Sequence, residues 1–158
     1  MDLSESYSQI AKEYAEKIFD ELAYKPKDRE ILDLFSQLVG ENAVVYDLGC
    51  GPGQISKYLK SKRLIPIGID ISSGMIEHAS RLNPDLEFKL GNMTTLLFPN
   101  DSAAGITAFY SLIHISKKTL PLVFEEVKRV LAPGGIFLFS FHIGDETVHL
   151  ALLRNYSK

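Results

Sequence analysis

The sequence predicts an α/β fold with a doubly wound, mostly parallel sheet of about five strands and helices on both faces. Three observations support this class. The apolar run Ala43–Leu48 leads into a glycine-rich turn and then into a helix-like segment, Gln54–Ser61. Strand-like and helix-like patterns continue to alternate after it. The last strand-like segment, Ile136–Phe141, is apolar on both faces, which is typical of a parallel strand covered by helices on both sides.

Length and composition are those of a single globular domain, residues 1–158. Apolar residues make up 46% of the chain and charged residues 23%. The formal net charge is −3 and no basic run stands out, so we expect no nucleic acid partner. No run of about 18 apolar residues occurs, so we expect no membrane partner. The single cysteine, Cys50, cannot form an internal disulfide, and we expect a cytoplasmic location.

Residues 1–40 are expected to form a helical cap. A first amphipathic helix is predicted from apolar residues that recur at intervals of four, namely Ile10, Tyr14, Ile18 and Leu22. A second helix is predicted over Lys27–Leu38, between Pro26 and Gly40. Its expected buried residues are Ile31, Leu34, Phe35 and Leu38.

Residues 41–142 are expected to form the sheet and its crossover helices. After the first strand, the predicted strands are Leu64–Asp70, Leu86–Leu90, Ala103–Tyr110 and Ile136–Phe141. The predicted helices are Gln54–Ser61, Ser73–Leu82 and Lys117–Leu131. Ser72 is a suitable N-cap for the second of these helices. The segment between the third and fourth strands, residues 91–102, is predicted to be a loop.

Residues 143–158 are expected to contain one more helix, Asp145–Asn155, with Val148, Leu152 and Leu153 on its apolar face. No sequence is then left for further strands. The fifth strand would be an edge of the sheet, and natural proteins cover such edges. We therefore expect either this helix or a second subunit, in a homo-oligomer, to cover it. The chain is either a fragment or a shortened protein.

The most informative motif is Asp47-x-Gly49-x-Gly51-x-Gly53. The dinucleotide fingerprint G-x-G-x-x-G would require glycine at position 54, where the sequence has Gln54. The motif resembles instead the first motif of the class I S-adenosylmethionine-dependent methyltransferases, which have a Rossmann-like fold. The resemblance extends over about residues 5–142 and implies that the family's last strands are missing. It also implies S-adenosylmethionine as cofactor and S-adenosylhomocysteine as product.

The resemblance implies a set of cofactor-binding residues. They are Tyr14, Asp47, Gly49, Cys50, Gly51, Gly53, Asp70, Ile71, Met75, Asn92, Met93 and Phe109. Asp47 either accepts a hydrogen bond from the ligand amine or only braces the glycine loop. Asp70 follows the glycines at the spacing of an acid that holds ribose hydroxyls. Met75 lies near the adenine or belongs to the core.

Two positions depart from the family pattern. Where many relatives have an aspartate that accepts from the adenine amino group, this chain has Asn92, whose carbonyl oxygen can accept without charge. The segment Leu97–Ile106 resembles P-F-P-D-x-S-F-D-x-V, with Ala103 and Ala104 in place of the aromatic and the second aspartate. The loss of that aspartate puts the rigidity of this part of the site in doubt. His114, after the fourth strand, is a weak candidate for a general base.

The leading functional hypothesis is a methyltransferase that transfers a methyl group from S-adenosylmethionine to a small-molecule acceptor. The alternative is a non-catalytic S-adenosylmethionine-binding module or fragment that acts with a partner. A nicotinamide-dependent dehydrogenase is a weak third hypothesis because of Gln54. No metal site is expected, because the four histidines are scattered along the chain.

Overall fold

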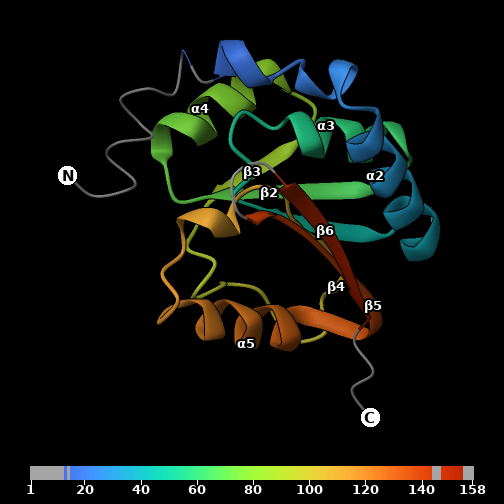
Figure 1. Cartoon of the computed structure of the whole chain (residues 1–158), viewed down its shortest axis with the longest axis vertical. Coiled ribbons are helices and arrows are strands. Elements are labelled where there is room, and N and C mark those ends of the chain that lie inside the picture. Colours follow the sequence, from blue (N-terminus) through green and yellow to red (C-terminus); the bar gives the residue numbers. More distant parts are fainter. Residues whose placement is uncertain (1–12, 14, 144–146, 155–158) are drawn as a thin grey trace.

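A computed structural model describes residues 13, 15–143 and 147–154 of the chain. Its strands form one sheet in the order β3-β2-β1-β4-β5-β6 (Figure 1). The strands are β1 (Val44–Leu48), β2 (Ile65–Asp70), β3 (Glu87–Leu90), β4 (Ala103–Ala108), β5 (Leu131–Ile143) and β6 (Thr147–Arg154). The first five are parallel and β6 is antiparallel to β5. The doubly wound α/β class is confirmed. β1 and β4 are the two central strands, and the order in which strands are added to the sheet reverses between them.

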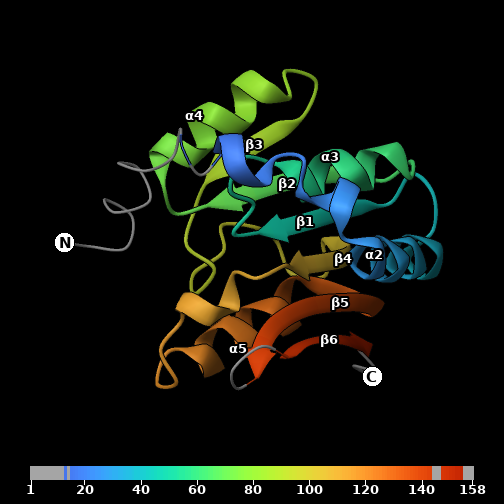
Figure 2. The same cartoon turned by 45° about the horizontal axis from the view of Figure 1, so that its top comes forward.

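Helices cover both faces of this sheet (Figures 1 and 2). The helical elements are η1 (Glu21–Tyr24), α2 (Pro26–Val39), α3 (Gln54–Ser61), α4 (Ser73–Leu82), η2 (Leu112–His114) and α5 (Leu120–Val130). Successive residues of a strand point to opposite faces. Val45 accordingly packs with residues of α2 and α3, while Tyr46 and Leu48 pack in a second cluster with residues of α5. The two clusters form the core above and below the sheet.

Most element bounds agree with the sequence prediction to within a few residues. The N-cap prediction for α4 is confirmed, because the Ser72 hydroxyl accepts a hydrogen bond from the Met75 N–H at 3.2 Å. In α2 the buried stripe is shifted: Leu32 and Phe35 are fully buried, whereas Leu34 and Leu38 are 43% and 44% exposed. The prediction for those two leucines was wrong, because the helix turns a neighbouring face to the sheet.

The prediction of a C-terminal helix over Asp145–Asn155 was wrong, because this part of the chain contains the strand β6. The chain instead turns back and pairs with β5 from Ile143↔Thr147 to Ile136↔Arg154. The apolar residues used for the helix also fit a strand, and the unpaired N–H and C=O groups of β5 offer hydrogen bonds that an isolated helix cannot use. The β5 edge is therefore covered within the chain by β6, which corrects the expectation of a helix or a second subunit there. The expectation that no antiparallel strand remains was also wrong.

Ile10 and Tyr14 of the first predicted helix lie outside the described residues, whereas Ile18 and Leu22 are described. The described part is α-helical up to Ile18, and Leu22 lies in the short η1 rather than in the predicted helix. Arg29 holds η1 against α2 by donating from Nη1 to the carbonyl oxygens of Leu22 and Ala23. This anchor fixes the position of η1 above the carboxyl ends of the strands.

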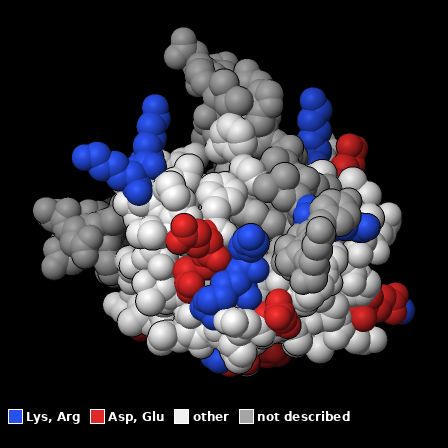
Figure 3. All heavy atoms as spheres, turned by 90° about the horizontal axis from the view of Figure 1, so that it is seen from below, with Lys and Arg blue, Asp and Glu red and all other residues white. Residues whose placement is uncertain are grey.

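The surface seen from below mixes acidic and basic side chains (Figure 3). Neither sign of charge forms a continuous area on that face. In the part of the chain that the structure describes, no helix has both the length and the apolar character needed to span a membrane.

Candidate cofactor site

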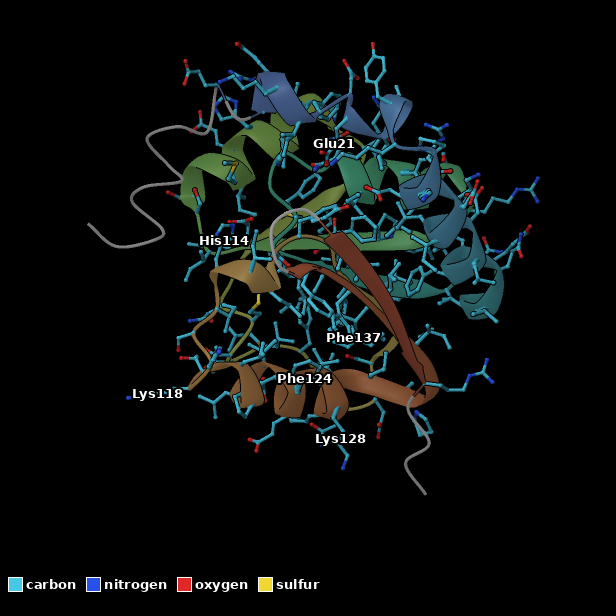
Figure 4. The ribbon with its side chains drawn as sticks, viewed as in Figure 1. Glu21, His114, Lys118, Phe124, Lys128 and Phe137 are labelled. Carbon is cyan, nitrogen blue, oxygen red and sulfur yellow. The ribbon has the colours of Figure 1, made fainter. Side chains whose placement is uncertain are left out.

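A cavity of about 670 Å³ opens at the carboxyl ends of β1, β2 and β4. Ligands bind at this edge in open parallel sheets, where the strand order reverses. Its lining comes from η1, the glycine loop, the starts of α3 and α4, and the segments after β3 and β4. Figure 4 labels Glu21 of η1 and His114 of η2, which are far apart in sequence and both line this cavity. The sequence-predicted residues that line it are Gly49, Cys50, Gly51, Asp70, Ile71, Met75, Asn92, Met93, Phe109 and His114.

The glycine loop is built from residues in the left-handed region. Gly49, Gly51 and Gly53 have φ values of 70°, 51° and 87°. At Gly49 a Cβ would stand 2.3 Å from the Cβ of Ser111, so only glycine lets the loop pack against the segment after β4. Gly53 is the N-cap of α3. A Cβ at this position would collide with the ring of Phe88 and would not point into the cavity. Gly53 thus shapes the loop and does not line the cavity.

Asp70 lies at the centre of the site. Its Oδ2 accepts from the N–H of Gly51 at 2.9 Å, and its Oδ1 accepts from the N–H of Ser72 at 2.9 Å. A carboxylate has about four lone-pair positions, so the backbone N–H groups leave it capacity to accept from a ligand. Burial raises the pKa of Asp70, and the backbone N–H groups oppose that rise. The β2 carboxylate is thus oriented by backbone and still able to accept from ligand hydroxyls.

Asp47, in contrast, is buried beneath the loop and does not line the cavity. Its two oxygens accept from the hydroxyls of Ser56 at 2.7 Å and Thr107 at 2.9 Å. Burial raises its pKa to about 6. Of the two alternatives for Asp47, this geometry favours the bracing of the loop, because α3 and β4 are tied to β1 through its carboxylate.

The amide oxygen of Asn92 makes local hydrogen bonds instead of pointing to a ligand. Its Oδ1 accepts from the N–H and the hydroxyl of Thr94, at 2.9 and 2.8 Å. Both lone pairs of the amide oxygen are used in this local turn, so acceptance from an adenine amino group is not supported by this geometry. Ile71, Met75 and Met93 line the same part of the cavity as an apolar wall, with Met75 fully buried.

The rigidity that Ala104 puts in doubt is supplied from α5. Arg129 donates from Nη2 to the Leu96 carbonyl and from Nη1 to the Phe98 carbonyl, both at 2.8 Å. Glu126 accepts from the Leu96 N–H at 2.7 Å and pairs with Arg129. The loop between β3 and β4 is therefore held to α5 by this ion pair.

His114 lines the cavity from η2. Burial lowers the pKa of its imidazole, and the nearby charge of Asp70 raises it less. Burial therefore favours the neutral form of the ring.

Three residues at the rim of the cavity, Glu21, Lys25 and Gln54, were missed by sequence reasoning. They line the cavity together with Tyr110 and Ser111. Tyr110 has a φ of 53°, and its hydroxyl donates to Asp28 of α2. A sequence signal existed only for Gln54, which is the first residue after the glycine loop. In the described ranges no three His, Cys, Asp or Glu residues gather as a metal site.

The residues present fit a nucleoside with an amino acid end. The cavity combines an oriented carboxylate, an apolar wall and a buried amide oxygen, Gln54 Oε1, for which the described residues provide no hydrogen-bond partner. Such an atom is costly unless a ligand or water satisfies it. The loop approaches the cavity with backbone rather than side chains, which suits a ligand that lies close to the chain.

Comparisons with known proteins agree with this arrangement. Residues 45–135, more than half of the chain, match the methyltransferase domain family. A demethylmenaquinone methyltransferase from Beutenbergia cavernae is 34% identical over 107 residues, covering 68% of this chain and 43% of the relative. Phosphoethanolamine N-methyltransferase 1 from Arabidopsis thaliana is 35% identical over 119 residues, covering 72% and 24%.

Among solved structures, a S-adenosylmethionine-dependent methyltransferase from Methanosarcina mazei has a TM-score of 0.65 and 29% identity, covering 68% of this chain and 56% of that chain. The chain spans less than half the length of the first curated relatives that it matches. The family match, the sheet order and the position of the cavity agree with one another. The chain therefore belongs to the class I S-adenosylmethionine-dependent methyltransferase family and matches its methyltransferase domain.

Proposed function

We propose that this chain binds S-adenosylmethionine in the described cavity and that its domain transfers the methyl group to a small-molecule acceptor. The observation that carries the proposal is Asp70, which the backbone of the glycine loop orients toward the cavity with lone pairs to spare. Two adjacent ribose hydroxyls are suitable donors for such a carboxylate. Asp47 and Gly53 support the site from behind the glycine loop, and Asn92 lines the cavity and holds the local turn at Thr94.

The bound cofactor would supply an activated methyl group on a sulfonium, and the protein's own task is to hold and orient. The glycine loop and Asp70 would fix the nucleoside, and Ile71, Met75 and Met93 would exclude water around it. Orientation of this kind accounts for much of the acceleration in a displacement reaction. Where the acceptor is protonated at working pH, a ring nitrogen of His114 would take its proton.

The acceptor is proposed only as a class. The curated relatives include enzymes named for demethylmenaquinone, phosphoethanolamine and the malonyl-[acyl-carrier protein]. These acceptors differ in size and charge. The difference suggests that the acceptor-binding part of such enzymes varies, whereas the cofactor-binding part is shared. A cytoplasmic location belongs to the same proposal and is supported by the buried, unpaired Cys50.

Isothermal titration calorimetry with S-adenosylmethionine and S-adenosylhomocysteine tests the proposal. We expect micromolar dissociation constants, on the order of −8 kcal/mol. NAD is the matched competitor, and its binding in preference to S-adenosylmethionine would revive the dehydrogenase hypothesis. A chain that binds neither sulfur ligand would refute the proposal. Binding without methyl transfer to any acceptor in a broad labelled screen would favour the non-catalytic module.

A further inference from the structure

The cavity has two chemically different ends. Its β2 end carries the Asp70 carboxylate, whereas its β4 end is lined by the segment that follows β4. The described lining residues of that segment include no lysine, no arginine and no carboxylic acid. They are Phe109, Tyr110, Ser111, Ile113, His114 and Ile115. We call these six residues the β4 wall, and its titratable groups are the Tyr110 hydroxyl and the His114 ring.

The hydroxyl groups of the β4 wall make hydrogen bonds within the protein. Tyr110 donates to the Asp28 carboxylate at 3.2 Å, and Ser111 donates to the Leu48 carbonyl at 2.8 Å. Burial and the negative charge of Asp28 raise the pKa of Tyr110, so its hydroxyl stays protonated. Burial favours the neutral form of the His114 ring (Figure 4), and neutral imidazole is a base. His114 is therefore the basic group of this wall.

The charged side chains that reach the cavity beside the β4 wall already pair with each other. Lys25 Nζ lies 2.7 Å from Glu21 Oε2 and 4.8 Å from the centre of the Tyr110 ring. Glu21 also accepts from Gln54 Nε2 at 3.1 Å. A charged group that leaves water needs an opposite partner. Among the described lining residues of this end, an acceptor's phosphate or ammonium would meet only charges that are already paired, so an uncharged acceptor is favoured.

Apolar side chains form most of the remaining surface at this end. The rings of Phe109 and Tyr110 meet edge to face, with centroids 5.3 Å apart. Ile18 of the cap and Ile115 line the cavity and are half-buried. Ile113 also lines it and is 45% exposed. An apolar ligand that covers these isoleucines removes apolar surface from water, which favours binding.

The base at this end restricts the type of group that can be methylated. A phenol loses its proton with a pKa of about 10, as the tyrosine side chain does, whereas water has a pKa of about 15.7. An aliphatic alcohol resembles water in this respect. Proton transfer to imidazole is effective when the two pKa values are not far apart. The neutral ring of His114 therefore suits a phenol better than an aliphatic alcohol.

We propose that the β4 wall receives an uncharged aromatic acceptor with a phenol-type hydroxyl. The acceptor ring packs against Ile18, Ile113 and Ile115, and its hydroxyl faces His114. The acceptor oxygen bonds to the methyl carbon as the bond from that carbon to sulfur breaks. The electron pair stays on sulfur, and the hydroxyl proton passes to the His114 ring. The assignment rests on the proposed function and names the acceptor class that it leaves open.

Phenols that differ in charge test the acceptor class. 4-Ethylphenol is uncharged, tyramine carries an ammonium, and 4-hydroxyphenylacetate carries a carboxylate. Each is titrated into the chain saturated with S-adenosylhomocysteine, and isoleucine methyl and histidine ring signals are followed by nuclear magnetic resonance. We expect 4-ethylphenol to shift the signals of Ile113, Ile115 and His114 but not Ile65, which is 50% exposed at the start of β2. The charged phenols should bind at least about tenfold more weakly.

Variants separate the acceptor site from the cofactor site. Ile113→Ser should weaken 4-ethylphenol about fivefold and leave S-adenosylhomocysteine within about twofold. Ile65→Ser is the matched control, because Ile65 has a similar exposure, and it should change neither affinity. With labelled S-adenosylmethionine, 4-ethylphenol should gain a methyl group on oxygen. His114→Gln should slow this transfer about a hundredfold and leave 4-ethylphenol binding within about twofold.

Several outcomes would overturn the inference while S-adenosylhomocysteine still binds. They are equal affinity for the three phenols, tighter binding of a charged phenol, and no binding of 4-ethylphenol at about 1 mM. An unchanged 4-ethylphenol affinity in Ile113→Ser would contradict the assigned wall. Absence of methyl transfer to 4-ethylphenol, or transfer at the wild-type rate in His114→Gln, would contradict the role of His114. A chain that does not bind S-adenosylhomocysteine refutes the proposed function itself.

Discussion

The carboxyl ends of β1 and β2 each carry an aspartate beside the glycine loop, but the two carboxylates are used differently. Asp47 is 1% exposed and both of its oxygens are occupied by the hydroxyls of Ser56 and Thr107. Asp70 accepts from backbone N–H groups and lines the cavity. The difference shows that a motif residue is a ligand or a brace according to which atoms surround it. Sequence position alone does not decide between the two.

The largest expected effect comes from removing the member of the pair that lines the cavity, Asp70. Asp70→Ala should weaken S-adenosylhomocysteine roughly a hundredfold, about 3 kcal/mol, because two hydrogen bonds to a charged acceptor are lost. Calorimetry measures the change. Asp85→Ala is the control, since Asp85 is an exposed acid paired with Lys60. An unchanged dissociation constant in Asp70→Ala would remove the ribose assignment.

The glycine loop between the two aspartates provides the next test. Gly49→Ala should lower the free energy of unfolding by about 2–3 kcal/mol, through a φ of 70° and a clash with Ser111. Gly134→Ala is its matched control, with a φ of 77° and nothing within 4 Å of an added Cβ. It should cost only about 1 kcal/mol. Urea unfolding gives both values, and equal losses would mean that the packing on Ser111 contributes nothing.

The burial of Asp47 should make the free energy of unfolding depend on pH. The pKa of Asp47 is about 6 in the folded chain, above its ordinary value of 3.8, so the folded state binds more protons between these values. Its contribution to stability is complete below about pH 4 and is lost as pH rises through about 6. Urea unfolding should show a loss on the order of 1–3 kcal/mol over this window, and Asp47→Asn should remove it. An identical pH profile in the variant would contradict the assignment.

The smallest expected effect is the influence of each aspartate's charge on the pKa of His114. The charge of Asp70 raises the pKa of His114, against the larger lowering by burial. Asp70→Asn should therefore lower the His114 pKa, and Asp47→Asn should change it less. Titration of the His114 ring protons by nuclear magnetic resonance measures both shifts. A larger shift in Asp47→Asn than in Asp70→Asn would reverse the comparison.

The sequence by itself determined the fold class, the glycine loop and the position of Asp70. These features depend on local patterns, namely the alternation of strands and helices, glycine spacing and the end of an apolar strand. It also determined the N-cap of α4, because a serine before a helix bonds to a nearby N–H.

Only the tertiary structure decided the remaining features. The apolar residues of 147–154 fit a helix or a strand, and the free edge of β5 selected the strand. Asp47 became a brace because Ser56 and Thr107, from α3 and β4, reach its two oxygens. Glu21, Lys25 and Gln54 are brought together at the cavity through side-chain contacts across the fold. Such contacts depend on how distant segments pack, and no local spacing in the sequence encodes them.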